Sequence, residues 1–254
     1  MKKYIKIVSV LCVVSLLFSL GTSAIDNQSY SWYCKRNSMH EQPQIDGEMS
    51  FIEDHGGFYV DKNSKDEKTV YLTFDAGYEN GNIEKILDIL KEEDVNGSFF
   101  VLENLLTKEP DLIKRMVNEG NIVCNHTATH KDISKLSFDE LNNELNRVET
   151  LFKEITDREL PKYFRPPEGR FSKESLQNLQ KLGYKTIFWS FAYADWDNNS
   201  QMSYENAMKK VMDNIHNGEI MLLHPTSSTN VKILPEVIKK LKSEGYNFKT
   251  VDKL

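Results

Sequence analysis

The stretch IVCNHTATH, residues 122–130, contains the pattern on which the prediction of the fold depends. An apolar run ends at Asn125 and is followed by two histidines four positions apart, His126 and His130. Short apolar runs bounded by turn signals are typical of buried strands. A strand that ends in such a turn can direct two imidazoles at one point, and neutral imidazole binds zinc and other late first-row metals. The spacing alone is equally typical of two surface histidines.

Similar apolar runs recur along the chain from Thr69 onward, and amphipathic stretches separate them. We expect strands at 69–75, 97–101, 121–126, 162–165, 185–190, 219–224 and 246–251. Helices are expected near 80–93, 110–119, 137–155, 172–182, 203–216 and 231–243. Ser137 and Glu140 form a capping box, Pro235 stands near a helix start, and several helices end in glycine. Strands that alternate with helices in this way predict a mostly parallel sheet.

Reactive side chains stand at the carboxyl ends of four of these predicted strands. They are Asp75, His126, Arg165 and His224. An α/β barrel builds its active site at this end of its strands, whereas an open sheet gathers its ligands at one switch point. The sequence therefore predicts an α/β fold, a distorted (β/α)7 barrel that resembles a TIM barrel and forms a single domain, residues 69–254.

The N-terminal residues have the composition of a targeting segment. Residues 1–24 combine a lysine-rich start, an almost wholly apolar stretch and small residues, which predicts a signal peptide; an uncleaved membrane anchor is the alternative. Either outcome places the protein outside the cytoplasmic membrane, as a secreted or anchored protein. Without the three lysines of this segment the net charge of −6 becomes −9. Nucleic acid requires a basic surface, so it is excluded as a partner, but a neutral glycan is not.

Residues 25–68 are polar and irregular with scattered aromatic residues, and we expect them to pack on the main domain as an N-terminal extension. A separate domain of this size would bury little apolar area. Two cysteines follow the predicted signal, Cys34 and Cys124. They could form a disulfide in an oxidising compartment, but Cys124 lies in an apolar run, where a free thiol behaves as a small hydrophobic residue. We favour two free thiols.

Two of the strand ends carry charged side chains with more than one interpretation. Asp75 could act as a general base, or it could cap the helix that follows. Arg165, which is followed by two prolines, could hold a carboxylate through two hydrogen bonds, or it could form a structural salt bridge.

Two further segments combine aromatic, acidic and imidazole side chains. Asp195 and Trp196 follow an aromatic-rich strand, and stacking faces beside carboxylates suit a sugar site. His224 follows Leu222 and Leu223, and a lone histidine after an apolar run is more often a satisfied core residue. The chemistry therefore depends on whether these side chains meet.

Taken together, five motifs resemble the polysaccharide deacetylases of carbohydrate esterase family four, the NodB homology fold. In chain order they are Thr73-Phe74-Asp75, His126-x-x-x-His130, Arg165-Pro166-Pro167, Asp195-Trp196 and Leu222-Leu223-His224. The match covers about residues 69–251. Three further stretches resemble the peptidoglycan N-acetylmuramic acid deacetylases, which act in spore-cortex formation: Trp32-Tyr33, Gly56-Gly57-Phe58-Tyr59 and residues 73–81.

The resemblance implies metal-assisted hydrolysis with a defined role for each motif. His126 and His130 would bind a divalent metal, with Zn²⁺ expected and Co²⁺ or Mn²⁺ as alternatives, which would activate the acetamide carbonyl and a water. Asp75 would take the proton from that water, and Arg165 would hold Asp75.

The remaining motifs would serve the leaving group and the substrate. His224 would protonate the leaving amine while Asp195 fixes its tautomer. Trp196 and Leu222 would form the acetyl pocket. Pro166 would contact the substrate, and the backbone N–H of Glu168 would bind the oxyanion.

Two positions depart from the wider family. Ala76 stands where most members have an aspartate ligand, so the metal should be weakly held, although the muramic acid subgroup shares this change. Glu168 stands where many members carry tyrosine; only a backbone N–H is needed there.

The resemblance predicts an amide hydrolase that deacetylates N-acetylmuramic acid in peptidoglycan, leading to muramic δ-lactam in spore cortex. The alternatives are a deacetylase of N-acetylglucosamine in peptidoglycan or chitin, and an inactive glycan-binding homologue. The expected partners are peptidoglycan glycan strands and, functionally, an amidase that removes stem peptides. We expect a monomer.

Overall fold

The structure is a computed structural model that describes residues 28–254. The predicted signal peptide, residues 1–24, lies outside the described residues. Within 28–254, no helix has both the length and the apolar character that crossing a membrane would require.

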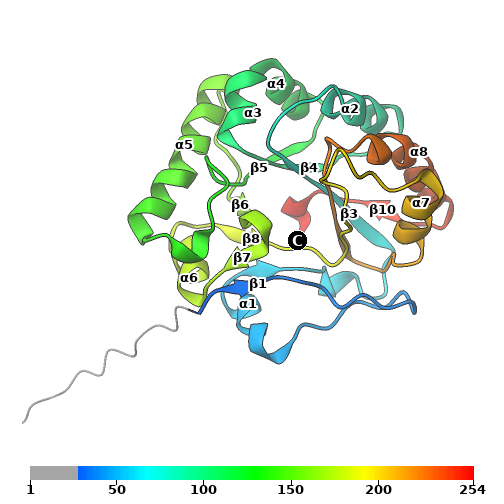
Figure 1. Ribbon diagram of the computed structural model, residues 1–254, viewed down its shortest axis with the longest axis horizontal. Coiled ribbons are helices and arrows are strands. Elements are labelled where there is room, and N and C mark those ends of the chain that lie inside the picture. Colours follow the sequence, from blue (N-terminus) through cyan, green and yellow to red (C-terminus); the bar gives the residue numbers. More distant parts are fainter. Residues whose placement is uncertain (1–27) are drawn as a thin grey trace, which may run out of the picture.

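A curled sheet of parallel strands forms the centre of the molecule (Figure 1). The strand order is β10-β3-β4-β5-β6-β8-β2, and β9 pairs with β3. The strands of this sheet are β2 (Gly57–Phe58), β3 (Thr69–Ala76), β4 (Ser98–Val101), β5 (Ile122–Asn125), β6 (Tyr163–Phe164), β8 (Lys185–Ile187), β9 (Glu219–Leu223) and β10 (Asn247–Phe248). All seven predicted strands are present, most of them shorter than expected.

The sheet turns back on itself between β8 and β9. Phe191, which follows β8, forms a parallel bridge with Met221 in β9. The backbone N–H of Ser190 donates to Ile220 O at 3.0 Å, and that of Leu222 donates to Phe191 O at 2.8 Å. This short seam produces the barrel-like closure that was predicted, and the fold is the expected distorted α/β barrel.

Helices surround the sheet on its outer side (Figure 1). They are α2 (Ile83–Glu92), α3 (Glu103–Lys108), α4 (Pro110–Asn118), α5 (Phe138–Thr156), α6 (Lys173–Lys181), α7 (Tyr204–Met212) and α8 (Ser228–Ser243), and α1 (Phe51–Asp54) lies in the N-terminal extension. The capping box of Ser137 and Glu140 is present at the start of α5. The short helix α3 was not predicted.

The expected position of Pro235 near a helix start is wrong. This proline lies inside α8, which begins at Ser228 rather than at 231. The helix begins earlier because the Ser227 side chain accepts a hydrogen bond from the backbone N–H of Asn230 at 3.1 Å and caps the first turn. Pro235 lacks an N–H and cannot donate to the carbonyl four residues before it, yet the helix continues.

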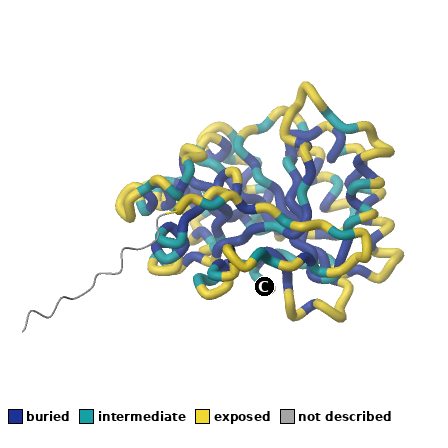
Figure 2. The backbone as a smooth tube through the Cα atoms, turned by 60° about the horizontal axis from the view of Figure 1, so that its bottom comes forward, coloured by how far each residue is buried: buried dark blue, intermediate teal, exposed yellow. Residues whose placement is uncertain are grey.

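The buried residues lie along the central strands and the helices that cover them, and the exposed residues lie mostly at the periphery (Figure 2). Every residue of β3 is buried except Asp75, which is partly exposed at the carboxyl end of the strand. The rings of Phe74 and Phe99 stack between β3 and β4, with centroids 4.8 Å apart. A strand buried on both faces is rigid, so the residue at its end is held in a fixed position.

The N-terminal extension packs against the barrel through aromatic residues. Trp32 is buried beside Tyr59 and Phe188, and its Nε1 donates to Trp189 O at 2.9 Å. Within the extension, β2 joins the main sheet beside β8, and β1 (Tyr30–Ser31) pairs antiparallel with β7 (Arg170–Phe171). The extension therefore contributes strands of its own, and the boundary at residue 68 stays a prediction.

Both cysteines that follow the predicted signal are free thiols. Cys124 is fully buried in β5, and burial raises the pKa of its thiol well above the usual range. Burial also raises the pKa of Cys34 to about 11.

Candidate active site

The sequence-predicted catalytic residues meet at the carboxyl ends of the parallel strands. Asp75 lies on β3, while His126, Arg165 and His224 each follow directly after a strand, β5, β6 and β9 respectively. Asp195 lies in the segment after β8 and reaches His224. Parallel strands end at the same edge of the sheet, which brings distant sequence positions together.

Arg165 is fully buried and holds Asp75. Its Nη1 donates to Asp75 Oδ1 at 2.8 Å, and its Nε and Nη2 donate to the carbonyls of Ile187 and Phe188, both at 3.1 Å. The guanidinium carbon lies 4.2 Å from the centroid of the Phe100 ring. Donors to three separate oxygens fix the guanidinium plane. The expected two-point contact with a carboxylate is not formed, because Nε and Nη2 are used by backbone carbonyls and only Nη1 reaches Asp75; the contact is a buried salt bridge.

Asp75 is ionised at neutral pH. Burial by itself would raise its pKa, but the charge of Arg165, helped by His126 and His224, outweighs burial and lowers the pKa below the usual carboxyl range. The second oxygen, Oδ2, lies 3.6 Å from His126 Nε2. An ionised carboxylate with one oxygen held and the other facing an imidazole is suited to accept a proton.

His126 is a neutral imidazole with a defined tautomer. Its Nδ1 lies 2.8 Å from the carbonyl oxygen of Arg165, which can only accept, so Nδ1 carries the proton. Burial lowers the pKa of His126 to about 4. Its Nε2 is therefore left with a free lone pair, which is the arrangement found in metal-binding histidines. The His130 ring lies beside it, with centroids 5.1 Å apart at 70°.

The turn that carries the two histidines is held by its own polar residues. Thr127 and His130 have φ of 71° and 58°, in the left-handed region that non-glycine residues rarely adopt. Asn125 Oδ1 accepts from the Thr127 N–H, and Thr127 Oγ1 accepts from the His130 N–H, both at 2.9 Å. Glu144 of α5 accepts from the backbone N–H of Thr129 at 2.8 Å.

Sequence reasoning did not single out Asn125 or Glu144. Asn125 was interpreted only as the last residue of a strand. An asparagine at that place can also form an Asx turn, in which its side chain accepts a hydrogen bond from the backbone N–H two residues later. Glu144 is almost fully buried and comes from a different element. No sequence signal connects it to the histidines.

The two imidazoles fit a metal site, but the site has few protein ligands. Ala76 is fully buried in the core and has no atom that can bind a metal. No group of three or more His, Cys, Asp and Glu side chains with ligand geometry occurs among the residues that the structure describes. A metal held by His126 and His130 would take its remaining ligands from water or substrate.

His224 and Asp195 form the second charged pair. His224 Nδ1 lies 2.7 Å from Asp195 Oδ1, and the backbone N–H of His224 donates to Asp195 Oδ2 at 2.8 Å. Burial by itself would lower the pKa of His224, but the hydrogen bond and charge of Asp195 outweigh it and raise the pKa. The proton on Nδ1 faces Asp195, and Nε2 faces away from it.

Asn230 belongs to this pair and was missed in the sequence. Its Nδ2 donates to Asp195 Oδ2 at 2.6 Å and to the His224 carbonyl at 3.0 Å. Its Oδ1 accepts a hydrogen bond from the Tyr193 hydroxyl. The only signal was the capping pattern Ser227-x-x-Asn230, which predicts a helix start and not a role in the site.

The predicted substrate-binding residues lie around these groups. Trp196 is 60% exposed and its ring meets the His224 ring edge-on at 6.0 Å, whereas Leu222 is buried in β9. Pro166 is buried just before Glu168, which has φ of 54°. An exposed tryptophan beside the His224 imidazole is available to stack on a sugar.

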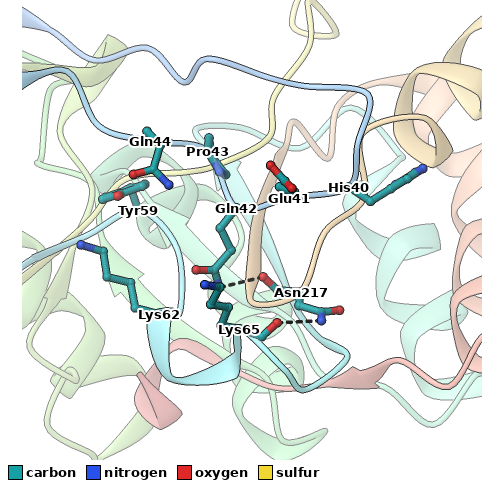
Figure 3. Close-up of a pocket in the computed structure, with 9 residues that line it drawn as sticks. All are labelled: His40, Glu41, Gln42, Pro43, Gln44, Tyr59, Lys62, Lys65 and Asn217. Carbon is teal, nitrogen blue, oxygen red and sulfur yellow. Dashed lines mark hydrogen bonds between the residues drawn. The ribbon is translucent and has the colours of Figure 1, made fainter.

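Two of the cavities in the described part of the chain differ in their relation to the predicted site residues. One, of about 260 Å³, includes His130, Pro167 and Glu168 among its lining residues. The other, of about 450 Å³, lies near the amino ends of β3 and β9 (Figure 3). There Gln42 Nε2 donates to Asn217 O at 3.0 Å, and no predicted site residue lines it. Of these two cavities, the one lined by His130 and Glu168 therefore lies beside the predicted site residues.

Known proteins resemble this chain over nearly its whole length. The family described as "Polysaccharide deacetylase" matches residues 62–187. The chain is 43% identical to an uncharacterized 30.6 kDa protein of Geobacillus stearothermophilus, covering 96% of this chain and 92% of that protein. It is 40% identical to the peptidoglycan-N-acetylmuramic acid deacetylase PdaA of Bacillus subtilis, covering 96% and 94%.

The solved structures show the same likeness. The structure of Bacillus subtilis PdaA, a family 4 carbohydrate esterase, matches with a TM-score of 0.87 at 40% identity, over 91% of this chain and 98% of that one. A family 4 carbohydrate esterase from Bacillus anthracis matches with a TM-score of 0.76 at 35% identity, over 91% and 98%. The predicted fold class is thereby confirmed.

Proposed function

This chain belongs to the polysaccharide deacetylase family, carbohydrate esterase family four, and is a hydrolase of amide bonds; we propose that it removes the acetyl group of N-acetylmuramic acid in peptidoglycan. The observation that carries the substrate assignment is the 40% identity, over nearly the full length of both chains, to a deacetylase named for that sugar. The organisation into residues 1–24, 25–68 and 69–254 is part of the same proposal.

Hydrolysis begins at Asp75, which accepts a proton from the attacking water. Its lowered pKa keeps it ionised, and Arg165 holds the carboxylate so that one oxygen remains free. The water oxygen forms a bond to the acetamide carbon, and the carbonyl oxygen becomes an oxyanion. The backbone N–H of Glu168, at the turn after Pro166, donates to that oxyanion.

His224 completes the reaction as a general acid. With Nδ1 held by Asp195, its Nε2 delivers a proton to the amine nitrogen as the C–N bond breaks, which releases acetate and a free amine. Asn230 positions Asp195, and Trp196 and Leu222 form the walls that surround the acetyl group. A raised pKa keeps His224 protonated at a higher pH than an isolated imidazole.

Deacetylases of this family are in general metal-dependent. We propose that His126 and His130 hold the ion, which we expect to be Zn²⁺, with Co²⁺ or Mn²⁺ as alternatives. When bound, the ion would act as a Lewis acid on the acetamide carbonyl. The hydrogen bond from His126 Nδ1 to the Arg165 carbonyl orients one ligand. Because Ala76 contributes no carboxylate, the ion should be weakly held, and Ala76→Asp should bind Zn²⁺ more tightly in calorimetry.

The product implies a cellular role. A free amine beside the lactyl group of muramic acid can close to a δ-lactam, as in spore cortex, once an amidase has removed the stem peptide. We place the protein outside the cytoplasmic membrane, where its glycan strands lie, and propose that it acts as a monomer.

The test uses the purified chain and two peptidoglycan preparations, one intact and one stripped of stem peptides by an amidase. Mass spectrometry should locate acetyl loss on muramic acid, mainly in the stripped strands, with Asp75→Asn as the inactive control. A chelator should abolish the loss, and added Zn²⁺ should restore it.

Other outcomes would redirect the assignment. Acetyl loss from glucosamine alone would keep the chemistry and overturn the substrate. No release with added Zn²⁺, Co²⁺ or Mn²⁺, with glycan binding retained, would instead indicate an inactive glycan-binding homologue.

A further inference from the structure

The cavity beside His130 contains two cations that the mechanism does not use. Its lining residues are His130, Asp132, Lys135, Pro167, Glu168 and Arg170. It shares His130 with the proposed metal pair and Glu168 with the proposed oxyanion site. A group bound there is therefore a neighbour of the reacting acetamide.

Arg170 is held by its backbone and leaves most of its guanidinium open. It lies on β7, where Arg170 pairs with Ser31 of the N-terminal extension and the next residue, Phe171, is fully buried. The side chain is 47% exposed. Its Nε donates to Glu168 Oε2 at 2.9 Å, and neither Nη atom has a hydrogen-bond partner within residues 28–254.

The charges around the cavity are balanced before a ligand enters. Arg170 is paired with Glu168, and Lys135 Nζ lies 3.4 Å from Asp132 Oδ2. An incoming anion would therefore gain little from net charge alone. The open Nη edge of Arg170 is what distinguishes the cavity, because two parallel N–H groups match the two oxygens of a carboxylate.

N-acetylmuramic acid carries such a carboxylate next to the reacting group. Its lactyl ether is on C3, and the acetamide is on the adjacent C2. N-acetylglucosamine has only a hydroxyl at C3. In strands that keep their stem peptide, the lactyl carboxyl forms an amide bond with that peptide and therefore has no charge.

We propose that Arg170, supported by Lys135, binds the free lactyl carboxylate of muramic acid in this cavity. The inference rests on the proposed function and deepens it, because one contact would select muramic acid over glucosamine and stripped strands over substituted ones. The pairing of β7 with β1 gives the N-terminal extension a part in substrate choice.

The experiment compares Arg170→Met with Arg158→Met, a matched change of an exposed arginine outside the cavity. The substrates are stripped glycan strands with a free lactyl carboxylate, and the same strands with that carboxyl converted to a primary amide. On the free acid, Arg170→Met should raise KM roughly tenfold or more with kcat changed little, because a hydrogen-bonded ion pair is lost. Arg158→Met should match the parent chain.

The specificity of the effect decides the proposal. On the amidated strands Arg170→Met should change KM less than twofold, and Arg170→Lys should fall between the parent and Arg170→Met because lysine cannot make the two-point contact. An unchanged KM on the free acid, or an equal rise on both substrates, would overturn the assignment. Melting temperatures of all variants show whether the fold is intact.

Failure of the proposed function would give a different pattern. If the parent chain released acetate only from glucosamine, the muramic acid assignment itself would fail. If the parent chain acted on muramic acid and Arg170→Met behaved like Arg158→Met, only the role of Arg170 would be wrong.

Discussion

A histidine–carboxylate pair stands at each end of β9, and the two pairs have different surroundings. After the carboxyl end, His224 Nδ1 lies 2.7 Å from Asp195 Oδ1. At the amino end, His216 Nδ1 lies 3.0 Å from Glu219 Oε2. In both pairs burial lowers the histidine pKa and the carboxylate more than reverses this, so the net pKa is raised.

The difference lies in the second ring nitrogen. His216 Nε2 is 2.9 Å from Ser190 Oγ and the side chain is only 4% exposed, so both nitrogens are engaged inside the protein. The His224 side chain is 26% exposed, and its Nε2 has no hydrogen-bond partner among the described residues. A raised pKa is common to both pairs, and only the open nitrogen identifies the one that can exchange a proton with a substrate.

Removing each imidazole tests this difference most strongly. His224→Gln should lower kcat by roughly 10²–10⁴, the usual contribution of a general acid, with little change in melting temperature. His216→Gln should instead reduce the free energy of unfolding by about 1–3 kcal/mol, since the fully buried Glu219, whose pKa is raised by burial, would lose its imidazole partner. Acetate release and thermal melts separate the two effects, and a loss of activity in a well-folded His216→Gln variant would contradict a purely structural role for His216.

A pH profile of Asp195→Asn tests the open pair by a smaller effect. The general acid acts when protonated, so activity falls as the pH rises through the pKa of His224. Removing the Asp195 charge should lower that pKa and move the alkaline limb of kcat to lower pH, with kcat at its maximum reduced about 100-fold. Chelator-treated enzyme and enzyme reconstituted with Zn²⁺ serve as controls for the contribution of the metal to the pH profile. An alkaline limb that stays in place would mean that another group sets it.

Each pair has a further hydrogen-bond partner, Asn230 for His224 and Asp195, and Ser190 for His216 and Glu219. Substitution of these two residues should produce the smallest effects. Asn230→Ala removes a donor to Asp195 and should lower kcat about tenfold with the alkaline limb shifted, because the carboxylate is less well positioned. Ser190→Ala should cost about 1 kcal/mol of stability and leave kcat unchanged. Equal losses of activity in both variants would show that the two pairs are not functionally distinct.

Most of the fold could be predicted because its central strands, β3, β4 and β9, are buried on both faces. Runs of mostly apolar, aromatic and β-branched residues such as Thr69–Ala76 are conspicuous in a sequence, and glycines mark the ends of the helices between them. The elements that escaped prediction are short ones, such as β1 and α3, whose conformation depends on a partner strand or a covering helix. The start of α8 was misplaced because the capping serine outweighed the signal of Pro235.

The candidate site divides in the same way. Asp75, His126, Arg165 and His224 could be named because each ends an apolar strand. Glu144, Asn230 and Arg170 could not, because their contacts come from other elements or from the surface of the barrel. Whether Cys34 and Cys124 form a disulfide was open as well; the structure shows both as free thiols.

The positions of the strands along the chain, the residues that end them and the family resemblance can be read from the amino-acid sequence, because periodicity and motifs are local properties of the chain. The sequence does not show which histidine keeps an open nitrogen or which arginine keeps open Nη atoms; these features appear only in the folded chain. Both depend on what the fold packs against each side chain. His224 and His216 each have a carboxylate partner, and the burial of His216 together with its contact to Ser190 gives it a structural role, whereas the open Nε2 of His224 leaves it a candidate chemical one.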